Sequence, residues 1–163
     1  MTARETIAGV QAFLDSYGAA FDRYDADAVA AHFLLPGHVT VDNPQVALVA
    51  MTDIAQCRAG TERVLALHRE IGAAASRTIQ FRVSALSPRL AVLDLRSEFV
   101  DGEGRALYDF EGFYTLAKTP DGWRIAAIAH NQMPRLLAAR DQSRGRMTIA
   151  SGAQESTTAS PAR

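Results

Sequence analysis

The chain has 163 residues and 48% of them are hydrophobic, which is enough for one compact domain with a substantial core but too little for two. Its 17 basic and 18 acidic residues leave a net charge of −1, without a dense basic run or the ~20 consecutive apolar residues of a membrane span, so we expect neither nucleic acid nor a membrane as a partner. Cys57 is the only cysteine, which excludes an internal disulfide and a multi-cysteine zinc site and fits a reducing, cytoplasmic compartment.

The N-terminal half predicts three helices and two short strands. Apolar residues recur at steps of three and four from Thr6 to Tyr24, the pattern of a helix with one buried face. A short helix is expected from Asp25 to Phe33, with Asp25 or Asp27 as its cap and a Leu-Pro-Gly sequence at its end. The remaining elements are strands at His38 to Asp42 and Val46 to Ala50 and a third helix from Asp53 to the stop signal at Gly72.

From Arg77 onward, apolar and polar residues alternate with a period of two, which is typical of strands with one buried face. The sequence Thr-Pro-Asp-Gly at 119–122 predicts a hairpin, because Pro presets φ and Gly accepts a positive φ. Helices followed by long antiparallel strands indicate an α+β fold. The expected strands are 77–85, 90–100, 107–118 and 123–132.

A last short helix should begin near Pro134. We expect the domain to span residues 1–141 and residues 142–163, which contain almost no large apolar side chain, to form a disordered tail. Within the sheet, Gly112 and nearby alanines leave room where a core is normally filled. This pattern indicates either an internal hollow or a bulge at Gly112.

Two strings, SYGAAFDRYDADAVAAHF at 16–33 and DGWRIAAIAHNQ at 121–132, together with the element order, resemble the nuclear transport factor 2-like superfamily, also described as SnoaL-like. The resemblance covers about residues 5–135 and is nearest to bacterial members of unknown function. It implies a cone-like curved antiparallel sheet, packed against three N-terminal helices and enclosing a pocket. The superfamily includes isomerases, dehydratases, cyclases, epoxide hydrolases and non-catalytic binders, so the fold does not fix the chemistry.

The ketosteroid isomerase branch of this superfamily offers a comparison residue by residue. Tyr17, eight residues before Asp25, matches its oxyanion-stabilising tyrosine. The position of its catalytic base falls on Asn43, and an amide cannot abstract a proton. Its second oxyanion donor falls near Tyr114. The pocket-facing positions of its last strand fall on Ile128, His130 and Gln132.

Three residues are the catalytic candidates. His130 is the best-placed acid or base, because an imidazole titrates near neutrality, although it would equally serve to cap the strand end. Tyr17 and Tyr114 would donate hydrogen bonds to a developing oxyanion, and the alternative for Tyr17 is a buried core residue. The expected substrate-binding residues are Asn43, His68, Tyr108, Phe110, Ile128 and Gln132. The four histidines lack a spacing such as HExxH, so we predict no metal and no cofactor.

The sequence therefore suggests a small-molecule pocket protein that acts as a cofactor-independent isomerase, dehydratase or cyclase on a small, apolar, oxygenated substrate. The alternatives are a non-catalytic binding or dimerisation module, and epoxide hydrolase-like water addition by Asp94 and Arg96, which more simply form a solvated or dimer-facing row. A homodimer is expected through the outer face of the sheet. Candidate interface residues are Phe113, Trp123 and Ile125.

Overall fold

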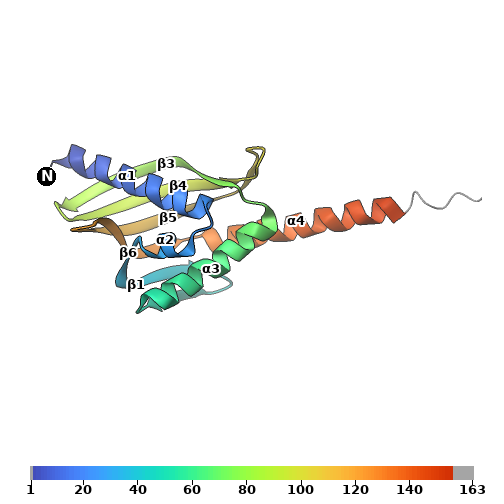
Figure 1. The fold of residues 1–163 in the computed structure, drawn as a ribbon, viewed down its shortest axis with the longest axis horizontal. Helices are drawn as coiled ribbons and strands as arrows, with labels where there is room; N and C mark the ends of the chain where they lie inside the picture. Colours follow the sequence, from blue (N-terminus) through green and yellow to red (C-terminus); the bar gives the residue numbers. More distant parts are fainter. Residues whose placement is uncertain (1, 156–163) are drawn as a thin grey trace, which may run out of the picture.

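In the computed structural model, which describes residues 2–155, helices and strands follow the predicted order (Figure 1). The helices are α1 (Ala3–Asp22), α2 (Ala26–Ala30), α3 (Ile54–Ile71) and α4 (Gln132–Glu155). The strands are β1 (Phe33–Asp42), β2 (Val46–Met51), β3 (Ala75–Ser87), β4 (Leu90–Val100), β5 (Ala106–Thr119) and β6 (Gly122–His130). Within the described chain they form one curved sheet in the order β2-β1-β6-β5-β4-β3, in which only the β1–β6 pair is parallel. The predicted α+β cone is confirmed.

Local signals in the sequence set most element ends. Asp25 caps α2, since its carboxylate accepts the Ala28 N–H at 2.9 Å, and Asp53 caps α3 in the same way. Gly72 ends α3 with a left-handed φ of 74°, as expected. The hairpin at 119–122 also forms, with Gly122 at a φ of 114°. These capping and turn residues fix where the helices meet the sheet.

Strand β1 begins earlier than predicted. It starts at Phe33 instead of His38, so the Leu-Pro-Gly sequence lies inside the strand, where the register with β6 shifts between Phe33 and His38. Gly37 allows this close pairing, because a Cβ at this position would lie 2.9 Å from the carbonyl oxygen of Ala126. α2 accordingly ends at Ala30.

Helices α1, α2 and α3 cover one face of the sheet, here called the inner face, and the opposite face is called the outer face (Figure 1). The main core joins α1 to the inner face of β4, β5 and β6, and Leu93, Leu116 and Ile125 are completely buried in it. Burial of each such side chain contributes roughly 1.5–3 kcal/mol. A second cluster contains Phe99, Tyr108 and Leu136, and Tyr114 and Ile128 of the main core also line a cavity.

Two of the expected interface residues belong to this core. Trp123 and Ile125 are 5% and 0% exposed, and α1 approaches so closely that a Cβ on Gly9 would lie 2.7 Å from Trp123 Nε1. The register between β5 and β6 shifts by one residue at Ala126, which reverses the alternation of side chains along β6. Trp123 and Ile125 therefore face inward, and the expectation that they form a dimer interface is wrong.

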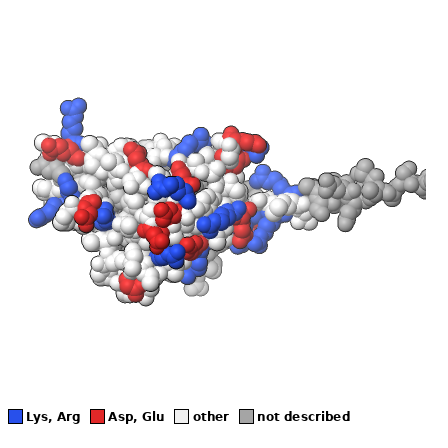
Figure 2. Space-filling view, viewed as in Figure 1, with Lys and Arg blue, Asp and Glu red and all other residues white. Residues whose placement is uncertain are grey.

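Helix α4 extends beyond Asp141, where we expected the domain to end. It continues to Glu155, so part of the predicted tail is helical, whereas residues 156–163 lie outside the described residues. No proline interrupts it after Pro134, and Arg144 bonds Glu70 of α3 at 3.0 Å. No helix within residues 2–155 is long and apolar enough to span a membrane. On the face shown in Figure 2, basic and acidic side chains are interspersed.

Candidate functional site

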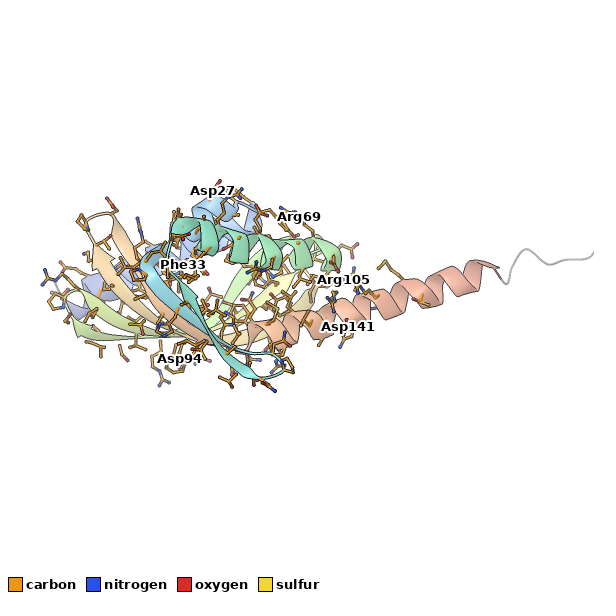
Figure 3. All side chains as sticks on the ribbon, turned by 90° about the horizontal axis from the view of Figure 1, so that it is seen from below. Asp27, Phe33, Arg69, Asp94, Arg105 and Asp141 are labelled. Atoms are coloured by element: carbon orange, nitrogen blue, oxygen red, sulfur yellow. The ribbon has the colours of Figure 1, made fainter. Side chains whose placement is uncertain are left out.

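An apolar cavity of about 610 Å³ lies between α3, α1 and the inner face of β1 and β6. Figure 3 looks at the protein from below, where α3 and β1 border this region and Phe33 is labelled between them. Its volume is within the range of small-molecule sites. The apolar lining includes Val29, Phe33, Val39, Met51, Ile128 and Met133.

Six of the nine predicted site residues line this cavity: Tyr17, Tyr114, Asn43, Ile128, His130 and Gln132. Asn43 lies at its exposed rim, beyond the end of β1. Phe110 instead lines a second cavity, and His68 and Tyr108 lie behind the wall of both. The sheet and the helices thus bring the two tyrosines and His130 to one cavity from three elements, α1, β5 and β6.

The hydroxyl groups of Tyr17 and Tyr114 have no hydrogen-bond partner within residues 2–155, although Tyr114 is only 3% exposed. The Tyr17 ring is fixed by stacking on Phe13, with centroids 5.7 Å apart, and by an edge contact with Phe21. Burial raises the pKa of Tyr114, and burial together with the nearness of Tyr114 and Cys57 raises the pKa of Tyr17 well above its usual value. Both hydroxyls therefore stay protonated at neutral pH and can donate.

Gly112 shapes the position of Tyr114. A Cβ on Gly112 would lie 2.9 Å from Tyr114 Cε2 and 3.3 Å from His130 Cβ. The room that Gly112 leaves is thus occupied by the Tyr114 ring and by His130, its partner on β6. The register shift of β5 lies further along, between Thr115 and Leu116, so Gly112 is a site of close approach.

His130 is the last residue of β6 and also borders a hollow on the outer face. Burial lowers its pKa, so the ring is neutral at pH 7. The backbone N–H of Gln132 donates to His130 Nδ1 at 3.3 Å, which places the ring proton on Nε2. In this tautomer, His130 offers the cavity an N–H donor, and its lone pair is engaged by the backbone.

A buried hydrogen-bonded chain connects His68, Tyr108 and Gln132. Gln132 Nε2 donates to Tyr108 Oη at 3.0 Å, and Tyr108 Oη lies 2.7 Å from His68 Nε2. Burial lowers the pKa of His68 to about 4, so His68 is neutral and accepts the Tyr108 hydroxyl proton. The chain orients the Gln132 carboxamide, whose oxygen has no partner within residues 2–155.

Among the described residues, the cavity lining contains no carboxylate, and Arg63 is its only charged residue. Asp94 and Arg96 lie on the outer face, where Arg96 bonds Asp109 at 2.7 Å, and the sheet separates them from the tyrosines. Their position fits the expectation of a solvated or dimer-facing row, and from the outer face they cannot activate water inside the cone. Within residues 2–155, no group of three or more His, Cys, Asp or Glu side chains is placed to hold a metal ion.

A model of the NTF2-like protein family DUF6841 matches residues 4–133. The chain belongs to this NTF2-like family. Most of the described chain outside the match is the C-terminal part of α4. No curated protein matches the sequence.

Solved bacterial structures share the NTF2-like fold. Aln2 from a Streptomyces species has a TM-score of 0.65 and 14% identity, with 85% of this chain and 99% of that chain covered. An NTF2-like protein with a cystatin-like fold from Novosphingobium aromaticivorans has a TM-score of 0.63 and 20% identity, with 84% and 88% covered. A candidate dehydratase of the NTF2-like family from Streptomyces avermitilis has a TM-score of 0.61 and 15% identity, with 80% and 97% covered. At these identities, the likeness concerns the fold alone.

Sequence reasoning missed the wall that β1, β2 and α3 give this NTF2-like cavity. Val39 and Val41 of β1 both line the cavity and alternate in the sequence with the polar residues His38, Thr40 and Asp42, so the sequence did contain a signal for this wall. Cys57 lines the cavity from α3, where burial raises the pKa of its thiol to about 11 and leaves it unreactive. Thr61 lines the same wall, and its hydroxyl bonds the Cys57 carbonyl at 3.0 Å.

Proposed function

We propose that this NTF2-like protein binds a small, largely apolar molecule through an oxygen atom held by Tyr17 and Tyr114. The observation that carries the proposal is the pair of protonated hydroxyls on the wall of an apolar cavity, neither of which has a partner within residues 2–155. Within residues 2–155 no buried side-chain nitrogen or oxygen lacks a hydrogen-bond partner, so both unbonded hydroxyls open onto the space of the cavity and are available to a ligand. A ligand oxygen would supply the acceptor.

The charges around the cavity favour an oxygen rich in electron density. Two hydroxyls and the Nε2–H of neutral His130 all donate, and no carboxylate lies nearby to repel an anion. A phenolate or enolate oxygen makes stronger hydrogen bonds with such donors than an ether oxygen does. The Gln132 carbonyl oxygen adds one acceptor for a donor group elsewhere on the ligand.

The experiment is a calorimetric comparison of 2-naphthol with its methyl ether, 2-methoxynaphthalene. We expect the naphthol to bind at least ~10-fold more tightly, because a site built on hydrogen bonds discriminates against an analogue that makes them poorly. Tyr17→Phe should remove this preference and keep the fold. Tyr24→Phe is the matched control, since the Tyr24 hydroxyl bonds the Ala73 carbonyl away from the cavity. Equal affinities for naphthol and ether in the wild type would refute the proposal.

A second candidate function is cofactor-independent proton transfer, of the isomerase or dehydratase kind, with His130 as acid or base. The observation in its favour is an imidazole on the same cavity wall as two oxyanion donors. Abstraction of a proton would first require His130 to exchange tautomers, because its lone pair accepts the Gln132 N–H. Deuterium exchange at the α-carbon of 2-tetralone, an enolisable ketone, tests it. Wild-type acceleration that His130→Ala removes, while naphthol still binds with an affinity lowered only by the loss of the Nε2–H donor, would establish proton transfer. No acceleration by the wild type would refute proton transfer and leave binding as the function.

We also propose that two copies associate through the outer face of the sheet. Phe113, 57% exposed, stands at the centre of this face beside Ala129 of β6, and a hollow of about 510 Å³ adjoins it. Leu48 and Val46 of β2 add apolar surface at 67% and 73% exposure. In a two-fold pair, each Phe113 would pack against the partner's outer face and leave water. Light scattering should give twice the 17.6 kDa mass of the chain, and a monomer mass at micromolar concentration would reject the pairing.

A further inference from the structure

A second cavity, of about 350 Å³, lies between α1 and the inner face of β3, β4 and β5. The first cavity is called the large cavity below, and this one the small cavity. Leu95, Phe99 and Phe110 give the small cavity an apolar base, and its other end reaches Asp15 of α1 and Arg77 of β3 at the surface. The proposed binding of an oxygen atom does not by itself require this space.

The two cavities share a wall. Tyr17, Phe21, Tyr114 and Gln132 line both of them. An oxygen atom bound by the two tyrosine hydroxyls would therefore lie at the junction of the cavities. Any group on the far side of that oxygen would point into the small cavity.

Ser97 is the unusual polar residue in the small cavity. It is one of five buried polar residues within the described chain, and the other four make side-chain hydrogen bonds to protein groups. The Ser97 hydroxyl has no such partner within residues 2–155, and it lies between Leu95 and Phe99 on the wall of the cavity. Since no buried side-chain nitrogen or oxygen within the described residues is left unbonded, the Ser97 hydroxyl must open into the cavity, where a ligand can supply its partner.

The roof of the small cavity is held in place by polar contacts at its edge. Asp22, at the end of α1, accepts hydrogen bonds from the Ser76 N–H at 2.7 Å and from Ser76 Oγ at 2.9 Å. One turn earlier, a Cβ on Gly18 would lie 3.0 Å from Ser76 Oγ. These contacts fix the distance between α1 and β3, so the helix cannot simply close onto the sheet.

We propose that the small cavity is a second subsite of the same ligand site, and that it takes the distal apolar end of an elongated ligand whose oxygen lies near its middle. This inference rests on the proposed function of the large cavity. An apolar cavity of about 150 Å³ is enough for benzene, so the small cavity accommodates a ring with room for a substituent. The ligand class is thus a ketone, enol or phenol with apolar groups on both sides of the oxygen-bearing carbon.

The test compares two ketones that share a phenyl ring and a carbonyl group. Acetophenone needs only the large cavity and the tyrosine pair, whereas benzophenone carries a second ring that requires the small cavity. Ser97→Leu should fill the small cavity, weaken benzophenone at least ~10-fold and change acetophenone by less than ~2-fold, since a misfitting ring in a packed site loses most of its contacts. Ser97→Val, with a smaller side chain, should give a smaller effect in the same direction.

Val41→Leu is the matched control, because it enlarges a side chain that lines only the large cavity and should weaken both ketones alike. Thermal unfolding checks that each variant is folded, and Ser97→Val replaces Ser97→Leu should the latter fail to fold. An unchanged benzophenone-to-acetophenone ratio in the Ser97 variants overturns the second subsite while the large cavity stands. Failure of the wild type to bind either ketone or 2-naphthol overturns the proposed function itself.

Discussion

Two tyrosines on the same strand give the sharpest prediction about stability. Tyr108 and Tyr114 are 8% and 3% exposed and both face inward from β5. The Tyr108 hydroxyl accepts from Gln132 Nε2 at 3.0 Å and bonds His68 Nε2 at 2.7 Å. The Tyr114 hydroxyl bonds no group within residues 2–155. Replacing each by phenylalanine removes the same atom from two different settings.

The expected change in the free energy of unfolding depends on which protein groups lose a hydrogen-bond partner in each variant. Tyr108→Phe leaves His68, 1% exposed, and Gln132, 9% exposed, each with one unpartnered nitrogen. Each orphaned group costs roughly 1–3 kcal/mol, so the free energy of unfolding should fall by about 2–6 kcal/mol. Tyr114→Phe leaves no protein group unpartnered. Its free energy of unfolding should change by less than about 0.5 kcal/mol, or rise slightly.

Urea unfolding, followed by the fluorescence of the single, buried Trp123, measures both changes with linear extrapolation. Tyr114→Phe should in addition lose the preference for 2-naphthol over its methyl ether. A loss of stability in Tyr114→Phe as large as that in Tyr108→Phe would show that the Tyr114 hydroxyl serves the fold. The proposed role of Tyr114 in ligand binding would then be refuted.

Three further predictions concern pH, assembly and packing. Burial holds the pKa of His68 at about 4, whereas an unfolded imidazole titrates near 6.5, so between these pH values the unfolded chain binds one more proton than the folded chain. His68 should therefore lower the free energy of unfolding by about 2 kcal/mol between pH 8 and pH 5. Urea titrations of a His68→Asn variant should show a smaller loss over that range, and an equal loss would contradict the low pKa of His68. Phe113→Asp should convert the proposed dimer to a monomer in light scattering. The control variant Ile7→Asp, at a 46% exposed position of α1, should leave the dimer intact. If both variants remain dimers, the interface does not include Phe113. Gly112→Ala should lower the free energy of unfolding by about 1–3 kcal/mol, because the new Cβ would lie 2.9 Å from the Tyr114 ring. In the control Gly102→Ala the new Cβ meets nothing within 4 Å, so stability should not change. Equal effects of the two variants in thermal or urea unfolding would contradict the close packing at Gly112.

The sequence predicted the fold well where local signals and periodicity agree. The change of period near Arg77, the turn at 119–122 and the stop at Gly72 each correspond to an observed element end. The failures came from features without a local signal. The extra residue at Ala126 reversed the faces of β6 and moved Trp123 into the core. The continued part of α4 contacts α3 through Arg144 and Glu70, which are 74 positions apart in the chain.

The candidate site was predicted in outline only. Family positions led to Tyr17, Tyr114 and His130, which do line one cavity. Whether each of these side chains can bind a ligand could not be predicted from the sequence, because this depends on which hydroxyls and ring nitrogens are already hydrogen-bonded to other protein groups. His68 was expected in the pocket, but it is bonded to Tyr108 behind the wall. Ser97 was missed, although it interrupts the apolar face that Leu93, Leu95 and Phe99 form along β4. Hydrogen bonds between residues distant in the chain decide these roles.

A crystal structure of the protein with 2-naphthol would locate the bound oxygen directly. The naphthol ring should lie in the large cavity, with its oxygen about 2.6–2.9 Å from the hydroxyl oxygens of Tyr17 and Tyr114. Naphthol bound only in the outer-face hollow beside Phe113, or with its oxygen directed away from both tyrosines, would refute binding through the tyrosine pair.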